Sequence, residues 1–387
     1  QLPENFYCSE FLIDEMIEYI DGGDKNKPFF SYVSFQAQHI PLQVPKEYTQ
    51  KYLTLYEEGW DVLRNNRLNA ARDKGLFPLD APIVDSLSSL KKWEEIDGQR
   101  KKFLIKSAAV FAGMLNAMDF HIGRLVSYLK ENDLYENTIF IITADNGPEG
   151  NNPEEHQAWR SWIGTTSYTR NIDTLGEKNS YVFIGTEFAQ AMASPHHMFK
   201  FHMNEGGLKV PLIISGNRIT KGVYSEFTYL TDIAATISKI ITGEVPERMI
   251  GKSLEQVLRG SLEKVYEDNE YIGLEVAGNS ALFKGDYKIL KNGPPTGDNI
   301  WHLYNLADDP GETNDLAKQK PDIFQQLLKH YDEYVADNGV IDLGPDYYWA
   351  TEMTVNTAKR RFAEFIPSLI FIILIIGLIV IVYIRRR

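Results

Sequence analysis

Cysteine is almost absent from this chain of 387 residues, and Cys8 is the single example. An intrachain disulfide is therefore excluded, and cysteine pairing carries no information on the redox compartment. The Asn-x-Ser/Thr sequon is absent as well, which disfavours a heavily glycosylated lysosomal or secreted enzyme. The sequence also lacks a positive charge balance. Its formal net charge is −13, so we do not expect nucleic acid as a partner.

A long apolar run stands at the C-terminal end. Residues 365–384 carry no charge and are rich in Ile and Leu, and a helix of that length crosses the hydrocarbon core of a bilayer. We therefore expect a linker over residues 341–364, a single transmembrane helix over 365–384 and a basic cytoplasmic tail over 385–387. The uninterrupted arginine cluster at residues 385–387 is expected on the cytoplasmic side, which places residues 1–360 on the periplasmic or extracytoplasmic side.

The start of the chain lacks the features that this topology requires. It has no signal peptide, and Gln1 is not an initiator residue. An extracytoplasmic domain needs an export signal, so we expect the chain to be part of a longer protein. Its composition, with 43% hydrophobic and 24% charged residues, is that of an ordinary globular protein with a sizeable core.

Residues 138–144 form a nearly continuous apolar run, which predicts a strand buried on both faces, as in a parallel sheet. The run ends at Asp145-Asn146-Gly147-Pro148, where Gly and Pro prevent its continuation. In open α/β sheets, ligands bind beyond the carboxyl ends of strands. A carboxylate beside an amide oxygen suits Ca²⁺ or Mg²⁺, but by itself the Asp-Asn-Gly segment is above all typical of a turn in which Asp145 caps a backbone amide.

Two other polar residues follow the same logic. Residues 28–35 predict a second sheet strand, and His39 lies just beyond its end. Lys200 precedes the Glu205-Gly206-Gly207 segment and a strand predicted over residues 210–215. The paired glycines predict close approach of two backbone segments. The alternative interpretations are that His39 is an ordinary surface histidine and that Lys200 is an exposed lysine outside any site.

The remaining segments give the domain organisation. We expect an α/β domain over residues 1–262 and a small antiparallel-sheet domain over 263–340. Long apolar periodicity predicts a helix over residues 101–129, whereas residues 46–99 and 308–312 are expected at the surface, the latter as a solvated turn. Further predicted helices cover 6–20, 229–241 and 321–335, short strands lie within 271–276, 280–290 and 300–306, and 148–198 is a long aromatic stretch of ordered packing.

Taken in order, these segments resemble the sulfatase family, most closely the bacterial periplasmic arylsulfatases of the alkaline-phosphatase-like superfamily. The matching segments are residues 29–45 with His39, residues 143–147 with Asp145 and Asn146, residues 179–181, residues 200–211 with Lys200, and the C-terminal motif of residues 301–316. The resemblance implies an α/β/α sandwich of the alkaline-phosphatase type, followed by a small antiparallel α+β domain.

The resemblance also implies a chemistry. Sulfatases hydrolyse sulfate esters with a formylglycine nucleophile and a Ca²⁺ ion, and their substrates include small aryl sulfates and sulfated glycans. On this basis Asp145 and Asn146 are expected as metal ligands. His39 is expected to contact the sulfate and the leaving oxygen, and Lys200 to place its charge on the bridging ester oxygen. A cation and an imidazole beside a divalent ion suit a transition state that spreads negative charge.

The sequence departs from the family at the nucleophile. It contains no Cys-x-Pro-x-Arg or Ser-x-Pro-x-Arg motif, and Cys8 is followed by Ser-Glu-Phe-Leu, so Cys8 is expected to be structural. The early pair of metal-binding aspartates is missing as well. We therefore expect an incomplete sandwich with an unsatisfied sheet edge, no sulfatase activity from these residues alone, and the N-terminal portion as a required partner, upstream or on a separate chain.

Two alternative functions remain open at this point. One is a phosphomonoester or phosphonate hydrolase of the same superfamily, which a Ser or Thr nucleophile would favour. The other is a catalytically inactive, membrane-anchored subunit that uses the sulfatase fold for binding. The presence of His39, Asp145, Asn146 and Lys200 together speaks against the inactive subunit.

Overall fold

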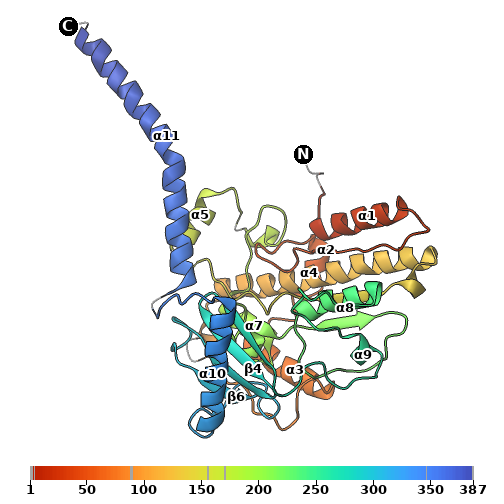
Figure 1. The fold of residues 1–387 in the computed structure, drawn as a ribbon. Coiled ribbons are helices and arrows are strands. Elements are labelled where there is room, and N and C mark those ends of the chain that lie inside the picture. Colours follow the sequence, from red (N-terminus) through yellow and green to blue (C-terminus); the bar gives the residue numbers. More distant parts are fainter. Residues whose placement is uncertain are drawn as a thin grey trace.

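The computed structural model describes residues 3, 5–87, 90–154, 157–169, 171–345 and 347–385. Its longest buried element is α4 (Gly98–Glu131), which agrees with the helix predicted over residues 101–129. The carboxylate of Asp97 caps this helix, because it accepts hydrogen bonds of 3.0 Å from the backbone N–H groups of Gln99 and Arg100. Helices α1 (Cys8–Asp21) and α2 (Lys46–Gln50) pack against α4 (Figure 1).

The core of this part of the molecule forms around α4. Trp60 from α3 (Gly59–Asp73), Trp93 from η1 (Trp93–Glu95) and Phe188 from α6 (Gly185–Ala193) are buried in the same hydrophobic cluster. The prediction that residues 46–99 form only a surface excursion is therefore wrong, because both tryptophans belong to the core. The remaining short helices are η2 (Tyr135–Asn137), α5 (Gln157–Thr165), η3 (Ile172–Thr174), α7 (Glu205–Leu208), α8 (Thr231–Thr242) and α9 (Glu255–Leu258).

Strand β1 (Phe140–Thr143) lies where a strand was expected, but its surroundings differ from the prediction. It pairs antiparallel with β2 (Leu212–Ser215), so that Phe140 faces Ser215 across the ladder. Ile142 of β1 is 38% exposed, so the expected parallel strand buried on both faces is wrong for this chain. An apolar run favours a strand with both faces covered, but it encodes neither the direction of the neighbouring strand nor which elements cover each face.

Residues 28–35, predicted as a second strand, belong to neither sheet. They follow α1 as an irregular segment, with Phe30 70% and Tyr32 78% exposed. Aromatic and β-branched residues favour a strand only where a partner supplies the ladder. Within the part of the chain that the structure describes, no strand pairs with this segment.

The predicted antiparallel meander is confirmed. Its four strands follow the order β3 (Tyr271–Val276), β4 (Asn279–Lys284), β5 (Tyr287–Lys291) and β6 (His302–Asn305). Helix α10 (Pro321–Asn338) packs on this sheet and ends at Gly339, which adopts a left-handed conformation with φ of 63°. The described chain is thus a mixed α/β fold with two antiparallel sheets.

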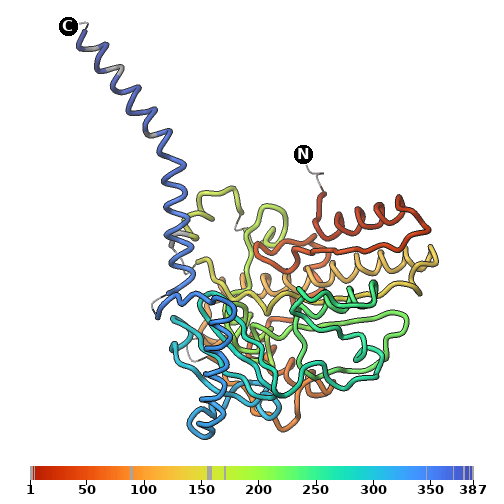
Figure 2. The backbone as a smooth tube through the Cα atoms, viewed as in Figure 1, coloured from red at the N-terminus to blue at the C-terminus, as the bar shows by residue number. Residues whose placement is uncertain are grey.

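Helix α11 (Trp349–Arg385) leaves the body beside this sheet and extends away from it (Figure 2). From Trp349 onward, the predicted linker over residues 341–364 is helical and continuous with the apolar span. The expected apolar span of residues 365–384 lies within α11, which is long and apolar enough to cross a membrane. Arg386 and Arg387 of the predicted basic tail lie outside the described residues.

Candidate functional site

Asp145 and Asn146 follow directly after β1. The side chain of Asp145 is exposed and that of Asn146 is half-buried, with its Nδ2 donating a 3.1 Å hydrogen bond to the carbonyl of Gly147. The turn is held by a 2.9 Å hydrogen bond from the Gly147 N–H to the Gly207 carbonyl. The two side chains therefore project from a turn whose backbone is fixed by a distant segment.

The distant segment is the loop of residues 197–208, which carries Lys200. A Cβ atom added to Gly147 would lie 1.9 Å from the carbonyl oxygen of Gly206, and one added to Gly206 would lie 2.4 Å from that of His197. The Lys200 N–H donates a 3.0 Å hydrogen bond to the Pro148 carbonyl. The close approach predicted for the paired glycines is thus confirmed, and it packs the Lys200 loop onto the Asp145 turn.

Lys200 is not an exposed lysine. Its Nζ lies 3.1 Å from Oε2 of Glu149, and the side chains are 15% and 7% exposed, respectively. Two buried opposite charges in contact orient one another far more strongly than a surface pair does. Glu149 is not among the predicted site residues, although it lies in a loop four residues after Asp145 and within reach of the same region.

The aromatic residue Tyr181 lies near Glu149. Burial, with a smaller contribution from the negative charge of Glu149, raises the pKa of Tyr181 to about 12, so the hydroxyl stays neutral at physiological pH. The ring makes edge-to-face contacts with Trp162 and Tyr168. The described aromatic residues of the stretch predicted over 148–198 are therefore packed in a cluster of their own, and Tyr181 in this cluster is close enough to Glu149 to be affected by its charge.

His39 lies at the edge of the same aromatic cluster. Its neighbour Ile40 packs against the cluster of Ile163, Tyr181 and Phe183. The His39 side chain is exposed, and its Nδ1 lies 2.8 Å from the carbonyl oxygen of Ile40. The backbone hydrogen bonds thus place the Lys200 loop on the Asp145–Asn146 turn, whereas His39 borders the aromatic cluster of Tyr181 through its neighbour Ile40. A catalytic role for any of the four stays a prediction.

The oxygen donors suit calcium in kind but are too few. Ca²⁺ takes six to eight oxygen ligands, and Asp145 and Asn146 supply two side chains. Among the residues that the structure describes, no group of three or more His, Cys, Asp and Glu side chains is arranged to hold a metal ion. Asp145 and Asn146 could therefore form only part of a metal site.

A buried ion cluster lies on the other side of the Lys200 loop. Nζ of Lys288 on β5 lies 2.8 Å from Glu205 and 2.7 Å from Glu312, and the Lys288 side chain is fully buried. Burial by itself would raise the pKa of Glu205, but Lys288 outweighs burial and lowers it. Burial raises the pKa of Glu312, because one ammonium cannot fully compensate two carboxylates. The predicted solvated turn over residues 308–312 is therefore wrong at Glu312, which is 3% exposed.

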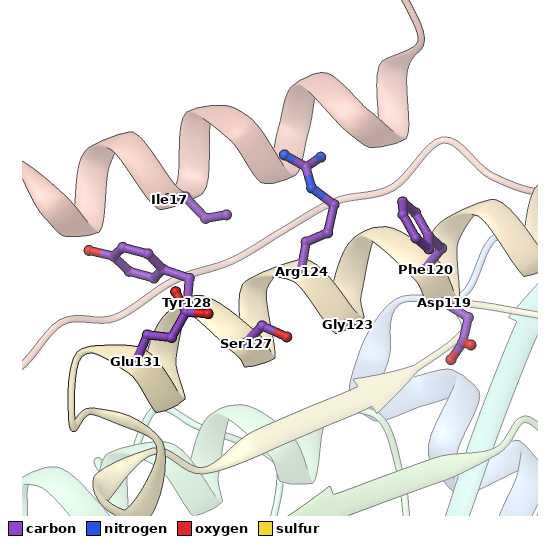
Figure 3. Close-up of a pocket in the computed structure, with 8 residues that line it drawn as sticks. All are labelled: Ile17, Asp119, Phe120, Gly123, Arg124, Ser127, Tyr128 and Glu131. Atoms are coloured by element: carbon purple, nitrogen blue, oxygen red, sulfur yellow. The ribbon is translucent and has the colours of Figure 1, made fainter.

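A shallow groove elsewhere on the surface does not involve these residues. It lies between α1 and α4 and is lined by Ile17, Phe120 and Arg124, among others (Figure 3). Arg124 is held by an ion pair of 2.5 Å with Asp14. None of the four predicted site residues lines this groove.

The arrangement of helices and sheets has counterparts among solved structures. A 20% identical crystal structure, Ps i-CgsB in complex with k-i-k-neocarrahexaose, aligns with 92% of this chain and 60% of its own chain at a TM-score of 0.56. A 16% identical protein, solved in complex with its substrate D-glucosamine-2-N,6-O-disulfate, aligns with 89% of this chain and 72% of its own at a TM-score of 0.51. Such low identities establish the fold alone.

Sequence comparison identifies the family. The sulfatase family profile matches residues 1–243, and the profile of the N-sulphoglucosamine sulphohydrolase C-terminal region matches residues 195–337. An uncharacterized sulfatase of Schizosaccharomyces pombe is 34% identical over 89% of this chain and 64% of its own length. An arylsulfatase of Klebsiella aerogenes is 28% identical over 65% of this chain and 54% of its own length. The chain belongs to the sulfatase family, and it spans about half to two thirds of the length of these two relatives.

Proposed function

We propose that this chain supplies part of the active site of a sulfuric ester hydrolase. The observation that carries the proposal is the packing of the Lys200 loop onto the Asp145–Asn146 turn, with Lys200 fixed by the buried carboxylate of Glu149. A fixed ammonium group is what departure of an alcohol from sulfate requires, because negative charge develops on the bridging oxygen. Family membership gives sulfate esters as the substrate class.

In this proposal each side chain has a separate role. Lys200 stabilises the negative charge on the bridging ester oxygen, and Glu149 orients the Lys200 ammonium group. His39 contacts the sulfate and the leaving oxygen. Asp145 and Asn146 contribute two ligands to Ca²⁺, which would neutralise charge on the sulfate oxygens when bound. The formylglycine nucleophile and the other metal ligands come from polypeptide outside these 387 residues, which contain no Cys/Ser-x-Pro-x-Arg motif.

The structure neighbours guide the choice of substrate. Two of them were solved with a neocarrahexaose and a glucosamine disulfate, which supports a sulfated glycan or a smaller sulfate ester as the substrate. We also propose that α11 anchors the protein in a membrane as a single span, with the catalytic part on the extracytoplasmic side, because residues 365–384 are free of charge.

The test is sulfate release from 4-nitrophenyl sulfate by the full-length polypeptide that contains this chain. Lys200→Ala should lower kcat by about 100-fold or more, because it removes a charge that acts in the transition state. The exposed Lys221 provides the control, since Lys221→Ala should leave kcat unchanged. Equal activity of the Lys200→Ala variant and the parent would refute the role of Lys200.

Two other outcomes identify the alternative functions. Hydrolysis of a phosphonate monoester in preference to 4-nitrophenyl sulfate would indicate the phosphonate hydrolase. An inactive binding subunit would hydrolyse neither. Calcium-dependent thermal stabilisation that Asp145→Asn abolishes would support the metal site, because a ligand that binds the native state stabilises it.

A further inference from the structure

The ammonium group of Lys200 has a second neighbour besides Glu149. Its Nζ lies 5.4 Å from the ring centroid of Phe201, within the range of a cation–π interaction. Phe201 adopts a left-handed backbone conformation with φ of 76°, which is costly for a bulky aromatic residue and persists only where the surroundings hold it.

The ring of Phe201 is held by the first residue of α11. Trp349 stacks on Phe201 with the ring centroids 4.6 Å apart and an interplanar angle of 28°. The backbone of Phe201 is held as well, because its carbonyl accepts a 2.6 Å hydrogen bond from Nδ2 of Asn279. Oδ1 of Asn279 in turn accepts a 2.7 Å hydrogen bond from the Gly293 N–H. The C-terminal sheet and α11 thus fix both the ring and the backbone of Phe201.

The root of α11, defined here as residues 347–350, is itself packed into the body. Ala350 is 3% exposed, and a Cβ atom added to Gly278 of the β3–β4 turn would lie 2.7 Å from Cδ1 of Tyr347. Farther along α11 the side chains are exposed, as at Val355 and Phe362. The start of this helix, through Trp349, is therefore the part that contacts the Lys200 loop.

We propose that Trp349 is a positioning residue for Lys200 and acts through Phe201. Trp349 limits the movement of the Phe201 ring, and this ring and Glu149 confine the Lys200 ammonium group from two directions. The root of α11 then belongs to the active site in addition to leading into the apolar span. This inference rests on the role of Lys200 in the proposed function.

The kinetic test uses the full-length polypeptide. Trp349→Ala should lower kcat on 4-nitrophenyl sulfate by about tenfold, since small displacements of a catalytic group are costly. Trp349→Phe, which retains an aromatic stack, should restore most of the activity, and Val355→Ala on the same helix should have no effect. In a Lys200→Ala background, Trp349→Ala should cost less than about twofold, because the two residues act as one unit.

The loss should also depend on the leaving group. A poor leaving group depends more on the Lys200 charge, so Trp349→Ala should reduce the hydrolysis of phenyl sulfate more than that of 4-nitrophenyl sulfate. A purely structural defect would reduce both rates equally and would lower the activity of the Lys200→Ala variant by the same factor. Either of these results would overturn the proposal.

A second measurement does not depend on activity. Competitive acetylation with acetic anhydride, followed by mass spectrometry, reports the reactivity of Lys200 itself. Trp349→Ala should change the labelling rate of Lys200 by about threefold, the equivalent of one lost cation–π contact, while Val355→Ala should leave it unchanged. If no sulfate ester is hydrolysed, the proposed function fails, and the labelling still decides whether Trp349 positions Lys200. An unchanged labelling rate would overturn the inference.

Discussion

At the scale of single residues, Gly147 determines how closely the two loops of the candidate site approach. A Cβ atom at this position would lie 1.9 Å from the carbonyl oxygen of Gly206, which is backbone and cannot rotate away. Gly147→Ala should therefore lower the free energy of unfolding by about 2–3 kcal/mol, as overpacking does elsewhere. Urea denaturation of the 387-residue chain measures this effect.

Gly222→Ala provides the matched control. Nothing lies within 4 Å of a Cβ atom built on Gly222, so its replacement should change the free energy of unfolding by less than about 0.5 kcal/mol. If the two variants unfold at the same urea concentration, the loops do not pack as tightly as the structure indicates.

Sequence reasoning at this scale succeeded where a residue type has a local cause. The glycine pair Gly206-Gly207 predicted a close backbone approach, and the Asp145 turn was expected at the end of a strand. Glu149 and Glu312 were missed because charged residues in loops are normally solvated. Their burial depends on Lys200 and Lys288, which lie far away in sequence, and no local pattern encodes such a partner.

At the scale of elements, the cluster of Lys288, Glu205 and Glu312 joins the meander to the Lys200 loop. Glu205 begins α7, Lys288 lies on β5, and the Glu205 N–H also donates a 2.9 Å hydrogen bond to Glu312. Lys288→Met would leave two carboxylates buried without their counter-charge. It should lower the free energy of unfolding by about 3–5 kcal/mol, measured by urea denaturation.

A lysine on α10 serves for comparison. Lys329 is 78% exposed and lies 3.8 Å from Glu333, so Lys329→Met should cost less than about 0.5 kcal/mol. Adding Glu312→Gln to Lys288→Met should recover part of the loss, because it neutralises one of the unpaired carboxylates. A Lys288→Met variant as stable as Lys329→Met would show that the cluster does not hold the elements together.

A second charged group at the start of β6 makes stability depend on pH. Partial burial would lower the pKa of His302, but hydrogen bonds to Asp315 and Asp298 outweigh burial and raise it. A raised native pKa means that the protonated form stabilises the fold. This contribution is complete below the unfolded pKa of about 6.5 and disappears as the pH rises through the native value. The pKa values of Asp298 and Asp315 are lowered. Their contribution to stability is therefore complete above about pH 4 and is lost as the pH falls through their native pKa values.

The pH dependence can be measured with His302→Asn. The substitution should destabilise the protein more at pH 5.5 than at pH 8.5. The difference should remain below about 1 kcal/mol, because the His302 side chain is 26% exposed and solvent screens it. An equal loss of stability at the two pH values would show that the charge of His302 does not contribute to folding.

At the scale of the whole molecule, sequence periodicity predicted most helices and the meander. It did not predict which elements lie beside residues 28–35 and β1, or how exposed these segments are to solvent. Helices and hairpins follow from local spacing and turn residues, whereas the covering of a strand depends on what lies beside it. Phe30, Tyr32 and Ile213 remain exposed. The family assignment needed the order of several weak motifs, since none of them identifies a sulfatase by itself.

The place of α11 in the molecule leads to the last prediction. Among the described residues, two helices are long and apolar enough to cross a membrane, but 44% of the apolar window of α4 is buried inside the protein, whereas that of α11 is not buried at all. The apolar residues of α4 are explained by its packing in the protein core, whereas in the described chain no other element buries the apolar window of α11. We therefore expect α11 alone to cause membrane association. The full chain should sediment with membranes and resist carbonate extraction, and a chain that ends after Arg361 should remain in the soluble fraction.

The shortened chain also separates anchoring from positioning. It keeps Trp349, so the stack on Phe201 and the acetylation rate of Lys200 should be unchanged, although the apolar span is gone. Ending the chain after Leu343 instead removes Trp349 as well, and the Lys200 rate should then change as it does in Trp349→Ala. If the chain that ends after Arg361 still sediments with membranes, the attachment must lie elsewhere, with the exposed aromatic residues at Phe30 and Tyr32 as the first place to examine. If it is soluble but its Lys200 rate has shifted, the membrane-spanning part of α11 influences the site in addition to its root.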